Sequence, residues 1–232
     1  MRLQVFDSPD ALAARVAQRL VASARRAIAA RGEFAVALSG GSTPRALYQQ
    51  LAHRNLDWSR IAVYWSDERF VPRDSALSNE SMARAALLDR VAAPRVFPMV
   101  CAGSAAASAE CYERCLPERL DLVLLGLGAD GHTASLFPGD AALHERTRKV
   151  TVGRGPDPAP WRITLSVPYI NRARAVWFLV AGADKADALA RVLHGPEDSE
   201  RTPAQAVARH ARRVTLYVDR GAAGDGGGLP AS

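Results

Sequence analysis

The 232-residue chain has only three cysteines, two lysines and few aromatic residues, and these shortages narrow its class. Cys101, Cys111 and Cys115 are odd in number and lack nearby histidine partners, so neither a disulfide framework nor a zinc site is expected. No apolar run approaches the roughly 18 residues of a membrane-spanning helix. Asp7 interrupts the first segment before the apolar core of a signal peptide develops. We therefore expect a soluble protein of the reducing cytoplasm.

Positive charge is carried almost entirely by arginine, and the formal net charge is +6. A basic chain can bind nucleic acid, but these arginines are spread along the sequence without a long basic run. An anionic small molecule explains local positive charge equally well. We expect a small-molecule partner, no nucleic-acid or membrane partner, and a monomer or weak homodimer.

Short apolar runs alternate with segments of helical periodicity through most of the chain. Strands are expected at residues 3–6, 34–39, 61–65, 95–99, 122–125, 149–152, 163–167, 174–180 and 215–218. Helices are expected at 11–30, 45–53, 80–91, 104–115, from about 132, and at 185–193. This alternation predicts a Rossmann-like α/β fold, an open and mostly parallel sheet with helices on both faces. We expect one domain over residues 1–220 and a disordered Gly-rich tail at 221–232.

The loop after the second expected strand has the sequence S-G-G-S-T-P, residues 39–44. Glycines let the backbone approach a ligand closely, and free N–H groups at a helix start bind anions, phosphate above all. Pro44 suits the first helical position, with a hydroxyl residue before it as the cap. No G-K-[ST] follows, so this is not a Walker loop. The loop predicts either an ordinary capped turn or a phosphate site, whose residues would be Gly40, Gly41, Ser42 and Thr43.

A polar loop follows the third expected strand. Asp67 and Glu68 come directly after that strand, at the edge where open parallel sheets bind ligands. Arg69 could hold an oxyanion or a phosphate by a two-pronged contact, and Asn79 lies in the same loop. The pattern fits either one wall of an active site or a solvated surface loop.

Residues 126–131, G-L-G-A-D-G, match the G-x-G-x-x-G fingerprint after an apolar run. A dinucleotide loop usually lies in the first βαβ unit and is followed about 20 residues later by an acid. This match lies past the midpoint, and residues 146–151 contain no acid, so a nicotinamide or flavin site is not expected. The adjacent His132 suits general acid–base catalysis instead, with Asp130 orienting its ring. A histidine satisfied within a turn stays the alternative.

Lys185 follows the strand expected at 174–180 and stands at a helix start. In a chain that otherwise uses arginine, a compact ammonium at this place would add to an anion site. A solvated surface lysine is the alternative interpretation.

Four of these segments together resemble one family, the 6-phosphogluconolactonases of the glucosamine-6-phosphate deaminase superfamily. They are S-G-G-S-T-P, the W-S-D-E-R loop with V-P and S-N, G-L-G-A-D-G-H-T-A-S-L-F-P, and R-I-T-L-S with V-A-G-A-D-K. The resemblance covers roughly residues 5–218. It implies hydrolysis of 6-phospho-D-glucono-1,5-lactone to 6-phospho-D-gluconate in the oxidative pentose phosphate pathway, with no metal and no organic cofactor.

The resemblance also implies roles for individual residues. His132 falls on the family's catalytic base, Arg69 on the arginine of D-E-R, and residues 40–43 on the loop that lines the sugar-phosphate site. It implies phosphate contacts for Arg162 and Lys185. We expect neutral His132 to take a proton from the attacking water, while Arg69 and backbone N–H groups stabilise the oxyanion. Asp67 and Asn79 complete the predicted site.

Glucosamine-6-phosphate deaminase is the nearest alternative. Its members typically have D-E-Y and a glutamate a few residues after the histidine. This chain has D-E-R at 67–69 and no glutamate between His132 and Glu145. Both differences favour the lactonase. A non-catalytic sugar-phosphate-binding module stays open, and a nucleic-acid binder would show steep salt dependence.

Overall fold

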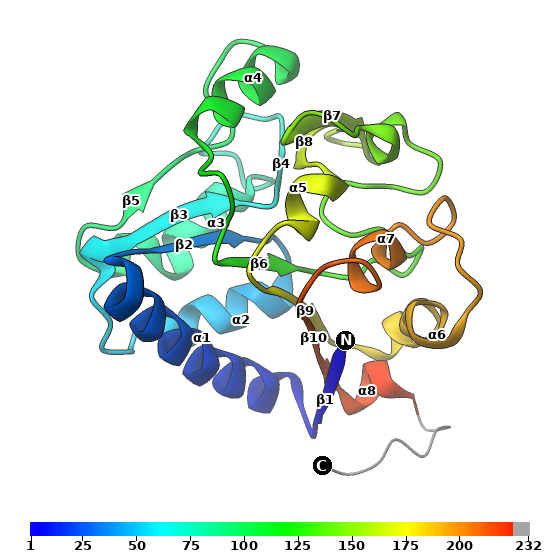
Figure 1. Cartoon of the computed structure of the whole chain (residues 1–232), viewed down its shortest axis with the longest axis horizontal. Coiled ribbons are helices and arrows are strands. Elements are labelled where there is room, and N and C mark those ends of the chain that lie inside the picture. Colours follow the sequence, from blue (N-terminus) through cyan, green and yellow to red (C-terminus); the bar gives the residue numbers. More distant parts are fainter. Residues whose placement is uncertain (225–232) are drawn as a thin grey trace.

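Seven strands form one open sheet in the computed structural model, which describes residues 1–224 (Figure 1). The strand order is β1-β10-β9-β6-β2-β3-β5, and every neighbouring pair is parallel. The predicted open parallel α/β fold is confirmed. The strands are β1 (Arg2–Phe6), β2 (Phe34–Leu38), β3 (Ile61–Trp65), β5 (Arg95–Val96), β6 (Leu122–Leu125), β9 (Val176–Val180) and β10 (Val214–Asp219).

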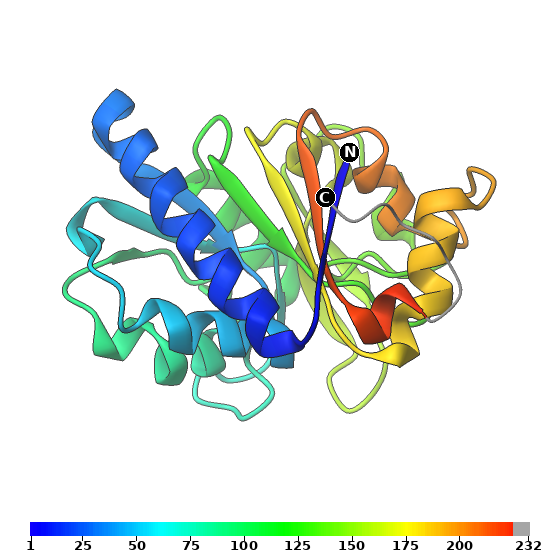
Figure 2. The same cartoon turned by 90° about the horizontal axis from the view of Figure 1, so that it is seen from below.

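Helices cover both faces of this sheet. Figure 1 places α1 (Pro9–Arg31) and α2 (Ser42–Leu51) together on one side, and Figure 2 shows α1 running obliquely across the strands. The other helices are α3 (Asn79–Ala86), α4 (Ala105–Cys115), α5 (Val167–Asn171), α6 (Ala186–His194), α7 (Ala204–Ala208) and α8 (Arg220–Ala223). Single 3-10 turns lie at Trp58–Arg60, Leu88–Arg90, Ala141–His144 and Ala183–Lys185. Among the described helices, none is both long and apolar enough to cross a bilayer.

The longest helix, α1, is fixed at both ends by local sequence. Ser8 caps it by accepting the N–H of Ala11 at 3.2 Å, and Pro9 occupies the first helical turn. Gly32 ends it in the left-handed region, with φ of +83°, and donates its N–H to the carbonyl of Ile28. The buried stripe of α1 consists of small and aliphatic side chains, which hold it flat against the sheet and α2.

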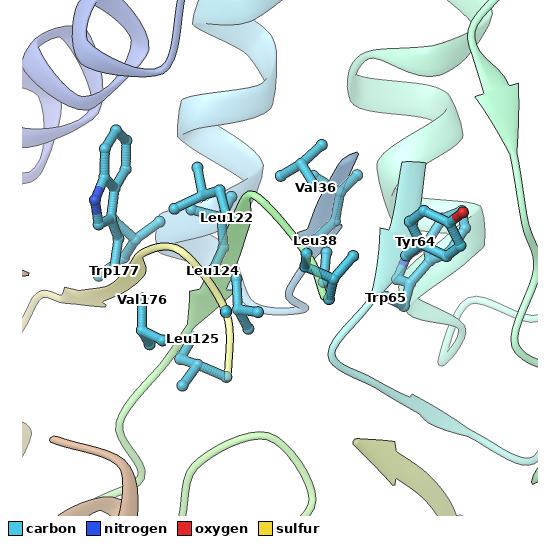
Figure 3. Packing of buried hydrophobic residues seen from close by; sticks show 14 of the residues in the cluster. Val36, Leu38, Tyr64, Trp65, Leu122, Leu124, Leu125, Val176 and Trp177 are labelled. Carbon is cyan, nitrogen blue, oxygen red and sulfur yellow. The ribbon is translucent and has the colours of Figure 1, made fainter. Parts of the chain in front are cut away.

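The core lies where the central strands meet the helices. β2, β3, β6 and β9 are buried along their whole length, as the continuous apolar runs F-A-V-A-L, I-A-V-Y-W, L-V-L-L and V-W-F-L-V require. Figure 3 shows side chains of all four strands in this cluster, among them Val36, Trp65, Leu124 and Val176. This packing fixes the level at which each strand ends.

The strand order also determines where a crevice opens. From β2 the chain continues to β3 and β5 on one side of the sheet, whereas from β6 it continues to β9 and β10 on the other. The register aligns Leu38 with Trp65 and Leu125 with Phe178, so the loops leave at similar levels. Loops that part in opposite directions at the carboxyl ends of neighbouring strands leave room for a ligand.

A second sheet of three antiparallel strands was not predicted. Its order is β4 (Asp67–Arg69), β8 (Trp161–Leu165) and β7 (Val150–Arg154). Two of these strands lie near expected strands, but residues 67–69 are polar and carry no strand pattern in the sequence. β4 follows β3 after one residue. The polar side chains at the edge of the large sheet are therefore held on a strand of the small sheet.

Some expected boundaries and one expected element are wrong. Within the described residues, no helix begins near His132; residues 126–137 form turns with an isolated bridge between Thr133 and Leu136. The helix expected at 80–91 ends at Ala86 and continues as a 3-10 turn. Residues 221–223 of the expected tail belong to α8, and residues 225–232 lie outside the described part of the chain.

Candidate active site

A cavity of about 260 Å³ lies at the carboxyl edge of the large sheet, where the loops after β2, β3, β6 and β9 converge. Of the eleven predicted site residues, nine line it: Gly40, Gly41, Ser42, Thr43, Asp67, Arg69, Asn79, His132 and Lys185. Asp130 contacts His132, and Arg162 lies outside the lining. We call this space the carboxyl-edge cavity.

The start of α2 forms one wall of the cavity. The helix begins at Ser42, and Gly41, with φ of +106°, is its N-cap without a side-chain hydrogen bond from the described residues. The expectation that Ser42 or Thr43 caps the helix and Pro44 opens it is therefore wrong. Pro44 is the third helical residue and has no N–H, so the backbone donors of Ser42 and Thr43 are the ones left at the helix end. An uncapped helix start that faces a cavity is a ready anion site.

Two buried side chains hold this glycine loop in place. The hydroxyl of Tyr48 accepts the N–H of Ser39 at 2.8 Å and donates to the carbonyl of the same residue at 2.7 Å. Complete burial raises the pKa of Tyr48 well above its usual value, so it stays neutral. Asn79 packs directly on Gly40, where an added Cβ would lie 2.0 Å from its Oδ1. Gly40 is thus required for close packing of Asn79 against the loop.

The two acids after β3 have different tasks. Glu68 is 2% exposed and accepts the hydroxyl of Ser78 and the N–H groups of Asn79 and Glu80, which caps the start of α3. Burial raises the pKa of Glu68 against the opposing effect of these hydrogen bonds. Asp67 lines the cavity instead, and its Oδ2 accepts the hydroxyl of Ser135 at 2.7 Å. Glu68 is a structural acid, whereas Asp67 faces the ligand space.

His132 and Asp130 form a pair at the cavity. Asp130 Oδ1 lies 2.6 Å from His132 Nδ1 and also accepts the backbone N–H of His132 at 3.0 Å. Partial burial opposes the charged form, but the hydrogen bonds from His132 prevail and hold the pKa of Asp130 below its usual value. A carboxylate at Nδ1 favours the tautomer with the proton on that nitrogen. Nε2 then carries the lone pair, and no hydrogen bond among residues 1–224 engages it.

Glycines around the pair allow this arrangement. An added Cβ on Gly128 would lie 2.0 Å from His132 Nδ1 and 2.5 Å from Asp130 Oδ1, so any side chain there would displace both groups. Gly131 has φ of +99° and packs against the backbone of Thr202. Gly126 differs, because an added Cβ would meet no atom of residues 1–224 within 4 Å although the residue lines the cavity. The fingerprint that resembles a dinucleotide loop therefore positions a histidine.

Two arginines lie opposite each other on the small sheet. Arg69 on β4 lines the cavity, and its Nη1 donates to the carbonyl of Leu77 at 2.6 Å. Arg162, its partner on β8, is buried, and its Nε and Nη1 have no hydrogen-bond partner in the described residues. Burial and the neighbouring charge of Arg69 lower the pKa of Arg162. Two guanidinium groups in this register favour an anion at this wall, although Arg162 does not reach the cavity lining.

Lys185 lines the cavity from the segment after β9. It ends a 3-10 turn directly before α6 and lines the cavity with its side chain one quarter exposed. Its Nζ lies 2.8 Å from Asp184 Oδ2, and this contact lowers the pKa of the Asp184 carboxyl. The ammonium is therefore held near the cavity with donors to spare.

Sequence reasoning missed several residues at the cavity or behind it. Ser135 is buried outside the lining and holds Asp67, whereas Ala134 lines the cavity with a positive φ of +49°. Leu179, Val180 and Ala181 line it because β9 is the neighbour of β6, a pairing that the sequence does not reveal. Across the described chain, no three His, Cys, Asp or Glu side chains gather in a way that could hold a metal ion.

An open parallel sheet with a polar cavity at its topological switch point defines a ligand-binding α/β protein of the Rossmann-like class. Within that class, the chain belongs to the family described as glucosamine-6-phosphate isomerases/6-phosphogluconolactonase, whose model matches residues 7–216.

Known relatives support this placement. The chain is 44% identical over 204 residues to a 6-phosphogluconolactonase of Synechocystis, covering 82% of this chain and 84% of the relative. It is similar to the structure of 6-phosphogluconolactonase from Trypanosoma brucei, with a TM-score of 0.87, 31% identity, and coverage of 96% and 97%. A monomeric glucosamine-6-phosphate deaminase has the same fold, with a TM-score of 0.85 at 22% identity and coverage of 95% and 100%.

Proposed function

We propose that this chain hydrolyses 6-phospho-D-glucono-1,5-lactone to 6-phospho-D-gluconate, a step of the oxidative pentose phosphate pathway. The observation that carries the proposal is the His132–Asp130 pair in a cavity that also contains the bare start of α2 and the ammonium of Lys185. A base and an anion site in one cavity of about 260 Å³ suit a small phosphorylated ester. The names of the relatives support the same substrate.

Hydrolysis begins with the histidine. Nε2 of neutral His132 takes a proton from a water molecule as the water oxygen bonds to the lactone carbonyl carbon. Asp130 holds the proton on Nδ1 and stabilises the imidazolium that forms. The bond between that carbon and the ring oxygen then breaks, and the ring oxygen receives the proton from the imidazolium. One water is consumed and the ring opens to the acid.

The oxygen of the lactone carbonyl becomes negatively charged as water adds, and this oxyanion needs positive charge near it. Arg69, with backbone N–H groups of the cavity, is proposed to stabilise it, and each such donor contributes roughly 10²–10³-fold in rate. Arg162 lies opposite Arg69, so its charge adds to the field at that wall and to the holding of an anionic group.

The phosphate supplies binding energy away from the reacting bond. We assign it to the N–H groups and hydroxyls of Ser42 and Thr43 at the start of α2, and to Lys185 in the same cavity. Gly40 and Gly41 keep the loop free of side chains where the ligand approaches. Asp67 and Asn79, held in place by hydrogen bonds, are available to sugar hydroxyls.

Deamination of glucosamine 6-phosphate is the competing function within the family. Ring opening there needs a glutamate shortly after the histidine, and this chain has none between His132 and Glu145. In the H-T-A-S-L-F-P stretch, the place of that glutamate is taken by Phe137. A binding module without catalysis would have no need of a histidine whose ring is held by a carboxylate.

The decisive experiment compares both substrates on one preparation. Freshly made 6-phosphogluconolactone is offered in a coupled assay that detects 6-phosphogluconate, with glucosamine 6-phosphate as the counter-substrate. We expect lactone hydrolysis above the spontaneous rate and no release of ammonia. Ammonia release, or a lactone rate equal to the spontaneous one, would reject the proposed activity.

The His132→Ala variant tests the mechanism. Loss of the general base should lower kcat by at least about 100-fold with little change in fold, because the side chain is partly exposed. His53→Ala, which removes an exposed histidine far along the chain, is the matched control and should retain the wild-type rate. A His132→Ala enzyme with a near-normal kcat would remove His132 from the role of base.

A further inference from the structure

A larger cavity lies at the other edge of the sheet. Its volume is about 540 Å³, and it is lined by residues near the first positions of β2, β6, β9 and β10, together with the last turns of α1. These are the amino ends of the parallel strands, so the cavity is separated from the carboxyl-edge cavity by the length of the sheet. No step of the proposed reaction uses it.

Arginine dominates this lining. Of its 15 residues, seven are arginines: Arg26, Arg31, Arg119, Arg172, Arg174, Arg212 and Arg213. That is a quarter of the 28 arginines in the chain, concentrated in a small part of its surface. They come from four separate segments, which explains why the sequence shows no basic run. We call this space the arginine cavity.

One acid balances this positive charge within the lining. Asp121 accepts Nη2 of Arg31 at 2.7 Å and lies 3.1 Å from Nε of Arg174, while its other oxygen accepts the N–H of Ala35. Asp121 thus holds two guanidinium groups beside the first residues of β2. Arg172 contacts the exposed Glu118 at 3.6 Å.

In the described part of the chain, the other four arginines have no acidic partner. Within residues 1–224, no ion pair engages Arg26, Arg119, Arg212 or Arg213, and all four are exposed. Seven cations and one carboxylate around one concavity raise the local positive potential, because the low-dielectric walls focus the field. A bound anion with several charges would relieve that repulsion.

The shape of the site favours a small ligand over a flat macromolecular surface. The floor consists of buried apolar groups, among them Phe34, Leu122 and Trp177, and the arginines form the rim. Guanidinium groups bind phosphate oxygens in two-pronged contacts, and several can share one polyphosphate. A nucleic-acid duplex presents a convex rod, which fits a concave rim of this size poorly.

We propose that the arginine cavity binds a small molecule with two or more linked phosphate groups, at a site independent of the carboxyl-edge cavity. Arg212 and Arg213 are adjacent, exposed cations, and Arg31 and Arg174 are positioned by Asp121. The same chemistry occurs in a nucleoside triphosphate and in inorganic triphosphate, and comparison of the two tells whether a base and ribose add affinity.

The test is calorimetric titration of the whole chain with inorganic triphosphate and with a nucleoside triphosphate at physiological salt. Wild-type protein should bind one equivalent, and the Arg212→Ser/Arg213→Ser double variant should bind at least about tenfold more weakly, since it lacks two charge-assisted contacts. Arg15→Ser/Arg19→Ser removes two exposed arginines of α1 outside the cavity and should bind as the wild type does. Lys185→Ala should also bind normally.

Several outcomes would overturn the proposal. They are no binding by the wild type, equal weakening in the Arg15→Ser/Arg19→Ser control, or loss of binding in Lys185→Ala, which would place the anion in the carboxyl-edge cavity. Displacement of triphosphate by equimolar duplex DNA would assign the surface to nucleic acid instead. Lactonase assays on the same variants keep the two sites apart, because the double variant should retain the wild-type kcat and KM.

Discussion

The two edges of the large sheet hold cavities built on opposite principles. The carboxyl edge has few charged side chains, and defined hydrogen bonds fix three of them: Asp130 pairs with His132, Asp67 accepts the hydroxyl of Ser135, and Arg69 donates to the carbonyl of Leu77. The amino edge has seven arginines and one organising carboxylate, with most cations exposed. Geometry dominates at the first edge and net charge at the second.

This difference follows from how the chain enters and leaves the sheet. Loops at the carboxyl ends contain the glycines and short polar residues that permit close packing, such as Gly40 under Asn79 and Gly128 under His132. The amino ends are approached by helix termini and turns, where long arginine side chains project into solvent. A change of one atom should therefore be felt most at the carboxyl edge, and a change of one charge at the amino edge.

Gly128→Ala should produce the largest effect from the smallest change. The added methyl would lie 2.0 Å from His132 Nδ1, so the ring and Asp130 must move, while no backbone strain arises because φ of Gly128 is not in the left-handed region. We expect kcat to fall at least about 100-fold, as for loss of the base itself. Steady-state kinetics with the lactone measure this, and thermal unfolding should change little.

Gly126→Ala is the control for that variant in the same loop. Its added methyl has no described protein atom within 4 Å, so His132 stays in place and kcat should be retained, whereas KM should rise because the residue lines the cavity. Equal kcat losses in the two variants would mean that the loop as a whole, and not the contact with His132, is what the first substitution disturbs.

A second pair of variants exchanges the acid at each edge for its uncharged isostere. Asp130→Asn should lower kcat about 10- to 100-fold, the worth of a hydrogen bond to a charged group, with little loss of stability. Asp121→Asn should leave kcat unchanged but lower the free energy of unfolding by about 1.5–3 kcal/mol, because Arg31, Arg174 and the N–H of Ala35 lose their shared acceptor charge.

Kinetics and denaturant titration of the Asp130→Asn and Asp121→Asn variants test whether the first change affects activity alone and the second affects stability alone. Loss of activity in Asp121→Asn without unfolding would show that the two edges are coupled. In that case the amino edge could not be treated as an independent site, and the separation drawn from the strand directions would fail.

Much of the carboxyl edge is readable from the sequence because its signals are local. Glycine and hydroxyl residues after an apolar run predict a loop at a strand end, and a histidine beside Asp130 and Gly131 predicts a positioned base. The sequence could not show which residue stands at the start of α2. Gly41, not Ser42 or Thr43, occupies the N-cap position and leaves the helix start without a side-chain cap, and the turn at His132 replaces the expected helix because Gly131 adopts a positive φ.

Features that depend on contacts between distant parts of the chain could not be predicted from the sequence for a different reason. β4 is a strand only because Asp67, Glu68 and Arg69 pair with β8, almost 100 residues later, and polar residues carry no strand pattern of their own. The arginine cavity is likewise invisible in the sequence. Its cations are spaced far apart along the chain, and only the shared direction of the parallel strands brings their preceding loops to one edge.

The smallest expected effect concerns stability in acid, and it separates Asp130 from a merely exposed carboxylate. The folded-state pKa of Asp130 lies below its usual value of about 3.9, so folding favours the charged form. Its contribution is fully present above about pH 4 and is lost as the pH falls through the lower folded-state pKa. Because half of the side chain is exposed, that contribution should be about 1 kcal/mol or less.

The difference in unfolding free energy between wild type and Asp130→Asn, measured from neutral pH down to about pH 2, should therefore shrink below pH 4. A difference that grows below about pH 4 would contradict the hydrogen bond between Asp130 and His132.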